Sequence, residues 1–204
     1  MNNYLMINGK QIDLTEEQAK EIKQSFGIGD IQLSAVGEGN TFKIGEYEFI
    51  LLELSGDTAA VILKDVLYKE KKFGKNNNYD GSDVDKLCVE FGEKIENLVG
   101  KGNLVEHTVD LTADDGLKCY GSIKRKMSLI TPQMYRKYVY TLDKYPLKLW
   151  WWLATAFSTA KHDDTDWVKC VSPHGRINSN LCNDFIGVRP FLYFVSSISV
   201  SCEE

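Results

Sequence analysis

The chain has 204 residues, of which 43% are hydrophobic and 26% are charged. This balance is typical of a folded globular protein with one well-buried core, and it excludes a disordered chain. The net charge of −5 argues against a protein that binds nucleic acid by neutralising many phosphates, because such binding needs a basic surface.

The first residues and the cysteines indicate the compartment. The start of the chain lacks the charged and apolar regions of a secretory signal, and no apolar stretch approaches the roughly 20 residues of a membrane span. Five cysteines are scattered without a C-x-x-C pair, which indicates neither a disulfide framework nor a zinc site. We therefore expect a cytoplasmic protein with reduced thiols, no membrane segment and no metal or other cofactor. A virion-associated copy is the alternative location.

Residues 1–27 are predicted to form a small separate unit. Asn8-Gly9 lies between runs of alternating apolar residues, which is a strong signal for a β-hairpin with a two-residue turn. A helix is expected to follow the hairpin. A hairpin and one helix bury too little apolar surface to be stable alone, so we expect this unit to dock on another surface.

The helix of this unit has clear boundaries in the sequence. Thr15 and Gln18 form a capping box at its start, and Gly27 is a typical stop. Residues 28–40 contain several glycines and are interpreted as a connector. The remaining residues, 41–204, are predicted to form the main domain.

The first half of the main domain is predicted to contain a β-meander and a long helix. Three β-rich runs separated by short turns indicate the meander: residues 41–44, 47–54 and 58–63. Ser82 then caps a helix whose apolar residues recur at the 3.6-residue period. Thr131 before Pro132 marks the start of another helix, which should end near Leu142.

The last third of the chain is predicted to alternate short strands with polar loops. Extended segments are expected at residues 149–154, 167–171 and 191–200. Two loops lie between them, at 155–166 and 172–187, and both are rich in Ser, Thr, Asp, Asn and His. Loops of this length without structure of their own are uncommon and tend to be functional or disordered.

Four bulky or charged side chains in this third suggest structural roles. Adjacent residues of a strand point to opposite faces, so the rings of Trp151 and Trp152 should pack on the two sides of a covered strand. A ligand-stacking platform is the alternative for the tryptophans that begin at Trp150. Arg189 precedes an apolar run, so its guanidinium should need a carboxylate or carbonyl partner where strand meets loop, and a structural ion pair is the favoured interpretation.

Polar clusters were also compared with functional motifs. Asn76 to Gly81 resembles the start of a calcium loop, but Leu87 stands where the bidentate glutamate belongs, so a turn is favoured. Asp114-Asp115 is likewise interpreted as a turn, whereas the carboxylates of residues 163–166 lie in a long loop where a cation or ligand contact stays open. The basic residues Lys118, Lys124, Arg125 and Lys126 are interpreted as a solvated hairpin.

The chain contains no complete catalytic motif. No nucleophile elbow, phosphate-binding loop or dinucleotide fingerprint is present. The remaining enzymatic arrangement would pair Cys170 or Cys182 with a histidine such as His174, since such partners meet in space rather than in sequence.

Several motifs in fixed order carry a resemblance to a known family. They are G-x-Y-x-F-I from Gly45, N-Y-x-x-S from Asn78, W-W-L-A-T from Trp151 and G-V-R-P from Gly187. The series extends over roughly residues 40–200 and resembles a family of uncharacterised proteins encoded by phages and mobile elements of Gram-positive gut bacteria. Its pattern in turn resembles the C-type-lectin-like fold of phage receptor-binding tips, diversity-generating retroelement proteins and formylglycine-generating enzymes.

The resemblance implies an α+β fold, with an irregular antiparallel sheet, flanking helices and a ligand face built from C-terminal loops. The motifs of calcium-dependent sugar binding and the closely spaced cysteines of the formylglycine enzymes do not occur in the sequence. Candidate ligand-binding residues are the polar residues of the two loops: Ser158, Thr159, His162, Asp163, Asp164, Asp166, His174, Arg176, Asn178, Asn180, Asn183 and Asp184.

The function predicted from these observations is a non-catalytic binding module that recognises a protein or a glycan. Two alternatives stay open. One is an intracellular inhibitor or regulator of a host protein, such as an anti-defence protein. The other is a Cys/His-dependent enzyme.

Overall fold

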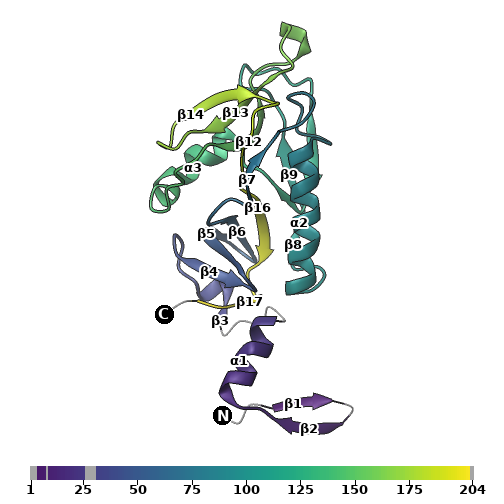
Figure 1. The fold of residues 1–204 in the computed structure, drawn as a ribbon, viewed down its shortest axis with the longest axis vertical. Helices are drawn as coiled ribbons and strands as arrows, with labels where there is room; N and C mark the ends of the chain where they lie inside the picture. The colour runs from purple at the N-terminus through teal and green to yellow at the C-terminus, as the bar shows by residue number, and fades with distance from the viewer. Residues whose placement is uncertain (1–3, 8, 26–30, 203–204) are drawn as a thin grey trace.

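The computed structural model describes residues 4–7, 9–25 and 31–202. Within these ranges strands dominate and three α-helices are present, so the fold is α+β as predicted. The helices are α1 (Glu16–Ser25), α2 (Asp83–Val99) and α3 (Pro132–Leu142). Figure 1 shows a large body containing α2, α3 and most strands, with the hairpin β1–β2 and α1 projecting from one end.

The first sheet of the body has six strands in the order β11-β16-β6-β5-β4, with β8 also paired to β16. The predicted meander forms three of these strands and is confirmed. Both faces of β5 and β6 are covered, which explains their nearly continuous apolar sequences. The strands are β4 (Thr41–Ile44), β5 (Tyr47–Ser55), β6 (Thr58–Leu63), β8 (Leu104–Val105), β11 (Met127–Ser128) and β16 (Phe191–Val195).

The second sheet has five strands in the order β14-β13-β12-β15-β7. Its neighbours are antiparallel except β12 and β15, which run parallel. The strands are β7 (Tyr68–Lys71), β12 (Trp151–Ala156), β13 (Trp167–Val171), β14 (Ile177–Leu181) and β15 (Ile186–Val188).

The predicted loop over residues 172–187 is wrong in part, because it contains β14 and β15. Strand β14 has a polar sequence with low intrinsic β propensity, yet it pairs along its whole length with β13 at the edge of the sheet. The expected strand over 191–200 is also divided, with β16 ending at Val195 and β17 (Ser199–Val200) pairing with β3 (Ile31–Gln32).

The two adjacent tryptophans of β12 pack on opposite faces of the second sheet. Trp152 lies in the larger cluster of buried side chains, and its Nε1 donates to the Lys71 carbonyl at 2.8 Å. Trp151 lies in the smaller cluster, together with Tyr135 and Tyr138 of α3. Both rings therefore pack in the core, which confirms the prediction that they lie on the two sides of a covered strand.

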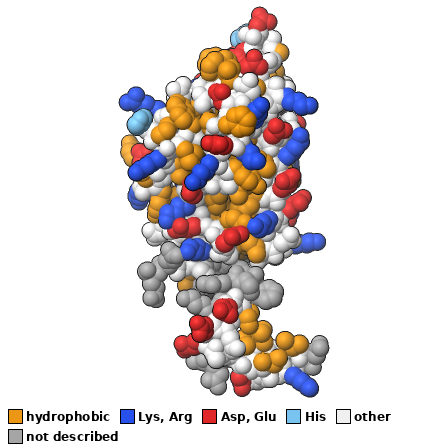
Figure 2. Space-filling model, in the orientation of Figure 1, with side chains coloured by type: hydrophobic (Ala, Val, Ile, Leu, Met, Phe, Trp, Pro, Cys, Tyr) orange, Lys and Arg blue, Asp and Glu red, His pale blue; other side chains and the backbone are white. Residues whose placement is uncertain are grey.

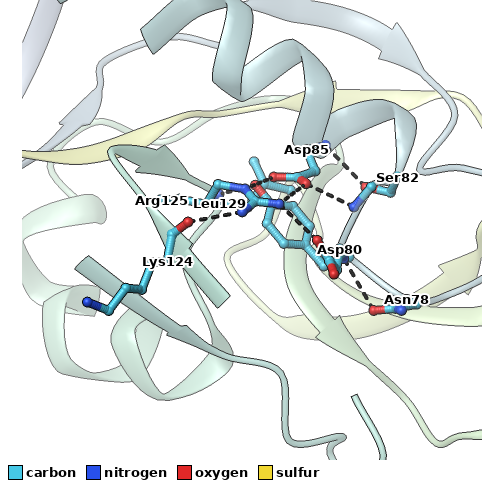
Figure 3. Close-up of polar contacts among 9 residues, drawn as sticks. Asn78, Asp80, Ser82, Asp85, Lys124, Arg125 and Leu129 are labelled. Atoms are coloured by element: carbon cyan, nitrogen blue, oxygen red, sulfur yellow. Dashed lines mark hydrogen bonds and ion pairs between the residues drawn. The ribbon is translucent and has the colours of Figure 1, made fainter. Parts of the chain in front are cut away.

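Helix α2 is fixed to the body by a polar network at its N-terminus (Figure 3). The Ser82 hydroxyl accepts from the Asp85 backbone N–H at 3.1 Å, which confirms the predicted cap. Arg125 Nη2 lies 2.7 Å from Asp85 Oδ2 and 2.9 Å from Asp80 Oδ1. The Asp85 carboxylate is almost fully buried, so Arg125 compensates a buried charge.

The basic cluster that contains Arg125 is therefore not simply solvated. Strands β9 (His107–Asp110) and β10 (Ser122–Arg125) do form the expected hairpin. Lys124 pairs with Glu106 at 3.4 Å and Lys126 with Glu96 at 2.7 Å. Glu106 and Glu96 thus offset the positive charges of Lys124 and Lys126. The hairpin therefore lacks the net positive charge that binding to a nucleic-acid phosphate backbone would require.

The N-terminal unit contains the predicted hairpin of β1 (Tyr4–Ile7) and β2 (Lys10–Asp13), followed by α1. The capping box is confirmed, because the Thr15 N–H donates to Gln18 Oε1 at 3.0 Å and the Gln18 N–H to Thr15 Oγ1 at 3.2 Å. Most side chains of both described strands are exposed, so the docking expected for this unit stays a prediction. Asn8 and the predicted stop at Gly27 lie outside the described residues.

Part of the predicted connector belongs to the body. A short 3₁₀ helix (Leu33–Ala35) follows β3, and Leu33 is fully buried in the larger core cluster. The backbone N–H of Leu33 donates to the Ile198 carbonyl at 2.8 Å. The body therefore begins at β3 rather than at β4.

Candidate functional site

The polar residues predicted to bind a ligand lie at two ends of the β13–β14 hairpin. Trp167 pairs with Leu181 at one end, and Val171 pairs with Ile177 at the other. The candidates at residues 158–166 and 183–184 flank the first end, whereas His174 and Arg176 lie in or beside the turn at the second. Trp167 and Val171 are four residues apart along β13, so the two ends are separated by about 13 Å at the usual rise of a strand. The structure therefore does not bring all the candidates together.

The first end is organised around Asn77, which is fully buried. Its Nδ2 donates to the carbonyls of Ser158 at 3.1 Å and Trp167 at 3.2 Å, and its Oδ1 accepts from the Tyr120 hydroxyl at 2.7 Å. Its backbone N–H donates to the Thr165 carbonyl at 2.7 Å. Sequence reasoning missed this role because Asn77 is one of three adjacent asparagines that look like an ordinary turn.

Asp115 supports the same loop from a second direction. Its Oδ2 accepts from the Ser158 hydroxyl at 2.5 Å and lies 3.0 Å from His162 Nδ1. The hydrogen bond from Ser158 is the main cause that lowers the pKa of Asp115. In a catalytic triad the histidine bridges the serine and the carboxylate, whereas here the carboxylate bridges the other two. The arrangement therefore positions the loop and does not activate Ser158.

Three of the candidate residues hold the loop instead of facing solvent. Ser158 and Thr159 are buried, and Asp164 Oδ1 accepts from the backbone N–H groups of Asp166 at 3.0 Å and Trp167 at 3.1 Å. This differs from the prediction that these side chains contact a ligand. Polar side chains that form hydrogen bonds with the loop backbone are not free to bind a ligand. The sequence alone does not distinguish them from polar side chains that face solvent.

The exposed residues of this end include three aromatic side chains. Phe157 is 45% exposed, Trp167 is 43% exposed and Phe185 is 62% exposed. The backbone joins their segments, because the Phe157 N–H donates to the Trp167 carbonyl at 2.9 Å and the Cys182 N–H to the Asp166 carbonyl at 2.6 Å. Figure 2 shows hydrophobic side chains at the surface of the upper part of the body.

We call this end the loop surface and define it by eight of its exposed side chains: Phe157, His162, Asp163, Asp166, Trp167, Asn183, Asp184 and Phe185. Ala160, Lys161 and Thr165 of the same loop are exposed beside them. Five of the eight were predicted from the polar composition of the loops. The sequence analysis did not include the three aromatic residues among the candidates. Their positions within or directly beside the two polar loops were the available signal. Aromatic side chains that stay exposed are typical of interfaces.

The candidate Cys–His pair is not assembled. Cys170 and Cys182 are both buried; burial raises the pKa of Cys170 to about 12 and also raises that of Cys182, which keeps both as thiols at neutral pH. Cys170 points into the larger core cluster, whereas His174 lines a cavity on the other side of the sheet. Cys182 lies at the opposite end of the hairpin from His174.

Of the remaining candidates, His174 and Arg176 lie at the second end of the hairpin, whereas Asn178 and Asn180 lie along β14, with Asn180 paired to Val168 beside the first end. His174, Arg176 and Asn178 are exposed, and Asn180 is half-buried in the edge strand β14. Arg189 is buried nearby, and it does not form the expected ion pair: Nε donates to the Leu63 carbonyl at 2.8 Å and Nη2 to the Lys64 carbonyl at 2.8 Å.

Among the described residues, no group of three His, Cys, Asp or Glu side chains could hold a metal ion. No helix in the described part of the chain is long and apolar enough to cross a membrane. No protein-family model, no curated protein and no solved structure matches the chain.

Proposed function

We propose that the body is a C-type-lectin-like, non-catalytic binding module of phage or mobile-element origin that recognises a protein or glycan through the loop surface. The observation that carries this proposal is the exposure of Phe157, Trp167 and Phe185 on loops whose backbone is fixed. Exposed aromatic rings lose little conformational entropy on binding and supply large contact areas.

The anchoring of the loops supports recognition by a preformed surface. Asn77 and Asp115 hold the loop of residues 157–166 through buried or half-buried hydrogen bonds. A surface that is ordered before binding avoids the entropic cost of ordering it on contact. Lys169 Nζ lies 5.5 Å from the centre of the Phe157 ring and Lys72 Nζ lies 5.1 Å from that of Phe185, while Asp163, Asp166 and Asp184 are exposed in the same loops. The surface therefore presents aromatic rings beside charges of both signs, which favours a partner with complementary polar groups.

The test measures binding with and without the aromatic side chains. The purified chain would be screened against a glycan array and a displayed library of proteins from Gram-positive gut bacteria. A specific ligand from either screen would then be titrated against Phe157→Ser, Trp167→Ser and Phe185→Ser. We expect at least one variant to weaken binding by roughly tenfold or more, because few aromatic residues dominate most interfaces.

Tyr140 supplies a matched control, since it is an aromatic residue on α3 that is 87% exposed and lies outside the loop surface. Tyr140→Ser should bind the ligand as tightly as the wild type. Thermal unfolding of each variant would show that the fold is intact. Wild-type affinity in all three folded loop variants would overturn the proposal.

A further inference from the structure

A second, smaller site lies at the other end of the β13–β14 hairpin. A cavity of about 210 Å³ opens there between α3 and the turn at residues 172–175. Its lining includes Tyr135, Asp143, His174 and Arg189. None of these residues belongs to the loop surface.

Arg189 is the unusual member of this lining, because only 2% of it is exposed. Nε and Nη2 are bound to backbone carbonyls, and the guanidinium carbon lies 5.3 Å from the centre of the Trp151 ring. Among the described residues, Nη1 has no hydrogen-bond partner and no carboxylate oxygen lies within 4.0 Å of the guanidinium. Arg189 is thus a buried cation without an ion pair within 4.0 Å, and the carboxylate that acts on its charge from farther away is that of Asp65, which does not line the cavity.

Such a charge is unfavourable unless it is compensated. Burial is the main cause that lowers the pKa of Arg189, to about 10, which leaves the group charged at neutral pH. Nη1 and the second hydrogen on Nη2 form one end of the guanidinium fork, which matches the two oxygens of a carboxylate. The cavity therefore contains an unused anion-binding group.

Asp143 limits which anion fits. The Tyr135 hydroxyl, which donates to the Gly175 carbonyl at 2.9 Å, lies near both Asp143 and Arg189 and is affected by both charges. A phosphate dianion would meet the negative charge of Asp143 in the same small cavity. A ligand with one carboxylate and one ammonium group complements both side chains.

We propose that this cavity binds a free α-amino acid, with its carboxylate on Arg189 and its ammonium group toward Asp143. The volume suits a ligand of that size, since drug-sized ligands occupy larger pockets, of about 300 Å³ or more. Trp151 and Leu147 supply an apolar wall for part of the side chain. The site is independent of the loop surface and does not rest on its function.

The turn beside the cavity is shaped to keep it open. Gly175 has a φ of +71°, and a Cβ at this position would lie 3.3 Å from the Tyr135 hydroxyl and 3.5 Å from Asp143 Oδ1. A side chain there would strain the backbone and crowd the two polar groups. The glycine therefore allows the backbone of the turn to lie close to Tyr135 and Asp143.

The experiment is an NMR titration of the ¹⁵N-labelled full chain with each L-amino acid, and separately with acetate and inorganic phosphate. We expect saturable shifts of the Ser172 and Gly175 amide signals with one or a few amino acids. N-acetylation of the best ligand, or Asp143→Asn, should weaken binding by roughly tenfold or more, because each removes the ammonium–carboxylate pair. Acetate, which lacks the ammonium group, should bind Asp143→Asn no more weakly than it binds the wild type.

Arg176→Gln is the matched control, because Arg176 is an exposed arginine beside the same turn that does not line the cavity. It should leave the affinity unchanged. Arg189→Met should abolish binding; if that variant does not fold, the Asp143 and N-acetyl results decide. Absence of saturable shifts with every amino acid, tighter binding of phosphate, or unchanged affinity in Asp143→Asn would each overturn the proposal.

Discussion

The body and the N-terminal unit differ in how their strands are covered. In the body, Leu51 and Ile62 on β5 and β6 are fully buried between other elements. In the hairpin, Met6 and Ile12 are about half exposed, although β1 and β2 pair in perfect register. Local sequence signals are equally clear in both regions. The difference shows that a hairpin with a two-residue turn pairs through its local sequence, whereas burying the paired strands requires contacts with distant segments.

The largest expected effect is the loss of the ion pair that fixes α2 to the body. Arg125→Ala leaves the Asp85 carboxylate buried and unpaired, and should lower the free energy of unfolding by about 3 to 5 kcal/mol. Urea denaturation followed by tryptophan fluorescence would measure it, because all four tryptophans lie in the body. Lys124→Ala is the control, since its pair with Glu106 is exposed and worth about 1 kcal/mol or less. Equal losses in the two variants would contradict this account.

The next effect is the pH dependence of the body, which arises from His107. Burial lowers the pKa of His107 to about 4, whereas the same group in the unfolded chain titrates near 6.5. The unfolded chain therefore binds the proton first, and stability falls as the pH drops from about 6.5 to about 4, by up to about 3 kcal/mol. Unfolding free energies measured across this range should show a smaller decline in His107→Gln. His174→Gln, at an exposed histidine, should decline like the wild type, and the same slope in all three chains would refute the assignment to His107.

A smaller effect compares the same capping motif in the two regions. Ser82→Ala should lower the free energy of unfolding of the body by about 1 kcal/mol, because α2 is packed into the core. Thr15→Ala removes an equivalent cap from α1, yet it should change only local opening of that helix, seen as faster amide hydrogen exchange. A loss of body stability in Thr15→Ala would show that the N-terminal unit and the body unfold together.

The smallest effect is expected in the hairpin itself. Ile12→Ser removes a half-exposed side chain and should change the unfolding free energy of the body by less than about 0.5 kcal/mol. Ile62→Val is the matched change in the body; it removes one buried methyl group and should cost about 1 kcal/mol. If Ile12→Ser destabilised the body more than Ile62→Val, the hairpin would have to pack against the body in solution.

The sequence predicted those parts of the fold that are set by neighbouring residues. The meander, both helices of the body and the opposite orientations of Trp151 and Trp152 follow from period, caps and turns. Strands β14 and β15 were missed because their pairing depends on β13, β12 and β7, which no local pattern reveals. Polar composition identified the loop region, but it did not distinguish the buried Ser158 from the exposed His162.

The interior positions of β15 and β16 have a consequence for biosynthesis. β15 lies between β12 and β7, and β16 lies between β11 and β6, although both strands come from residues 186–195. While a ribosome is still making this segment, β6 and β12 each keep an open edge that other chains could join. The body therefore completes both sheets only after nearly all of its residues have been synthesised. A nascent chain stalled before residue 186 should be a substrate for chaperones rather than a folded intermediate.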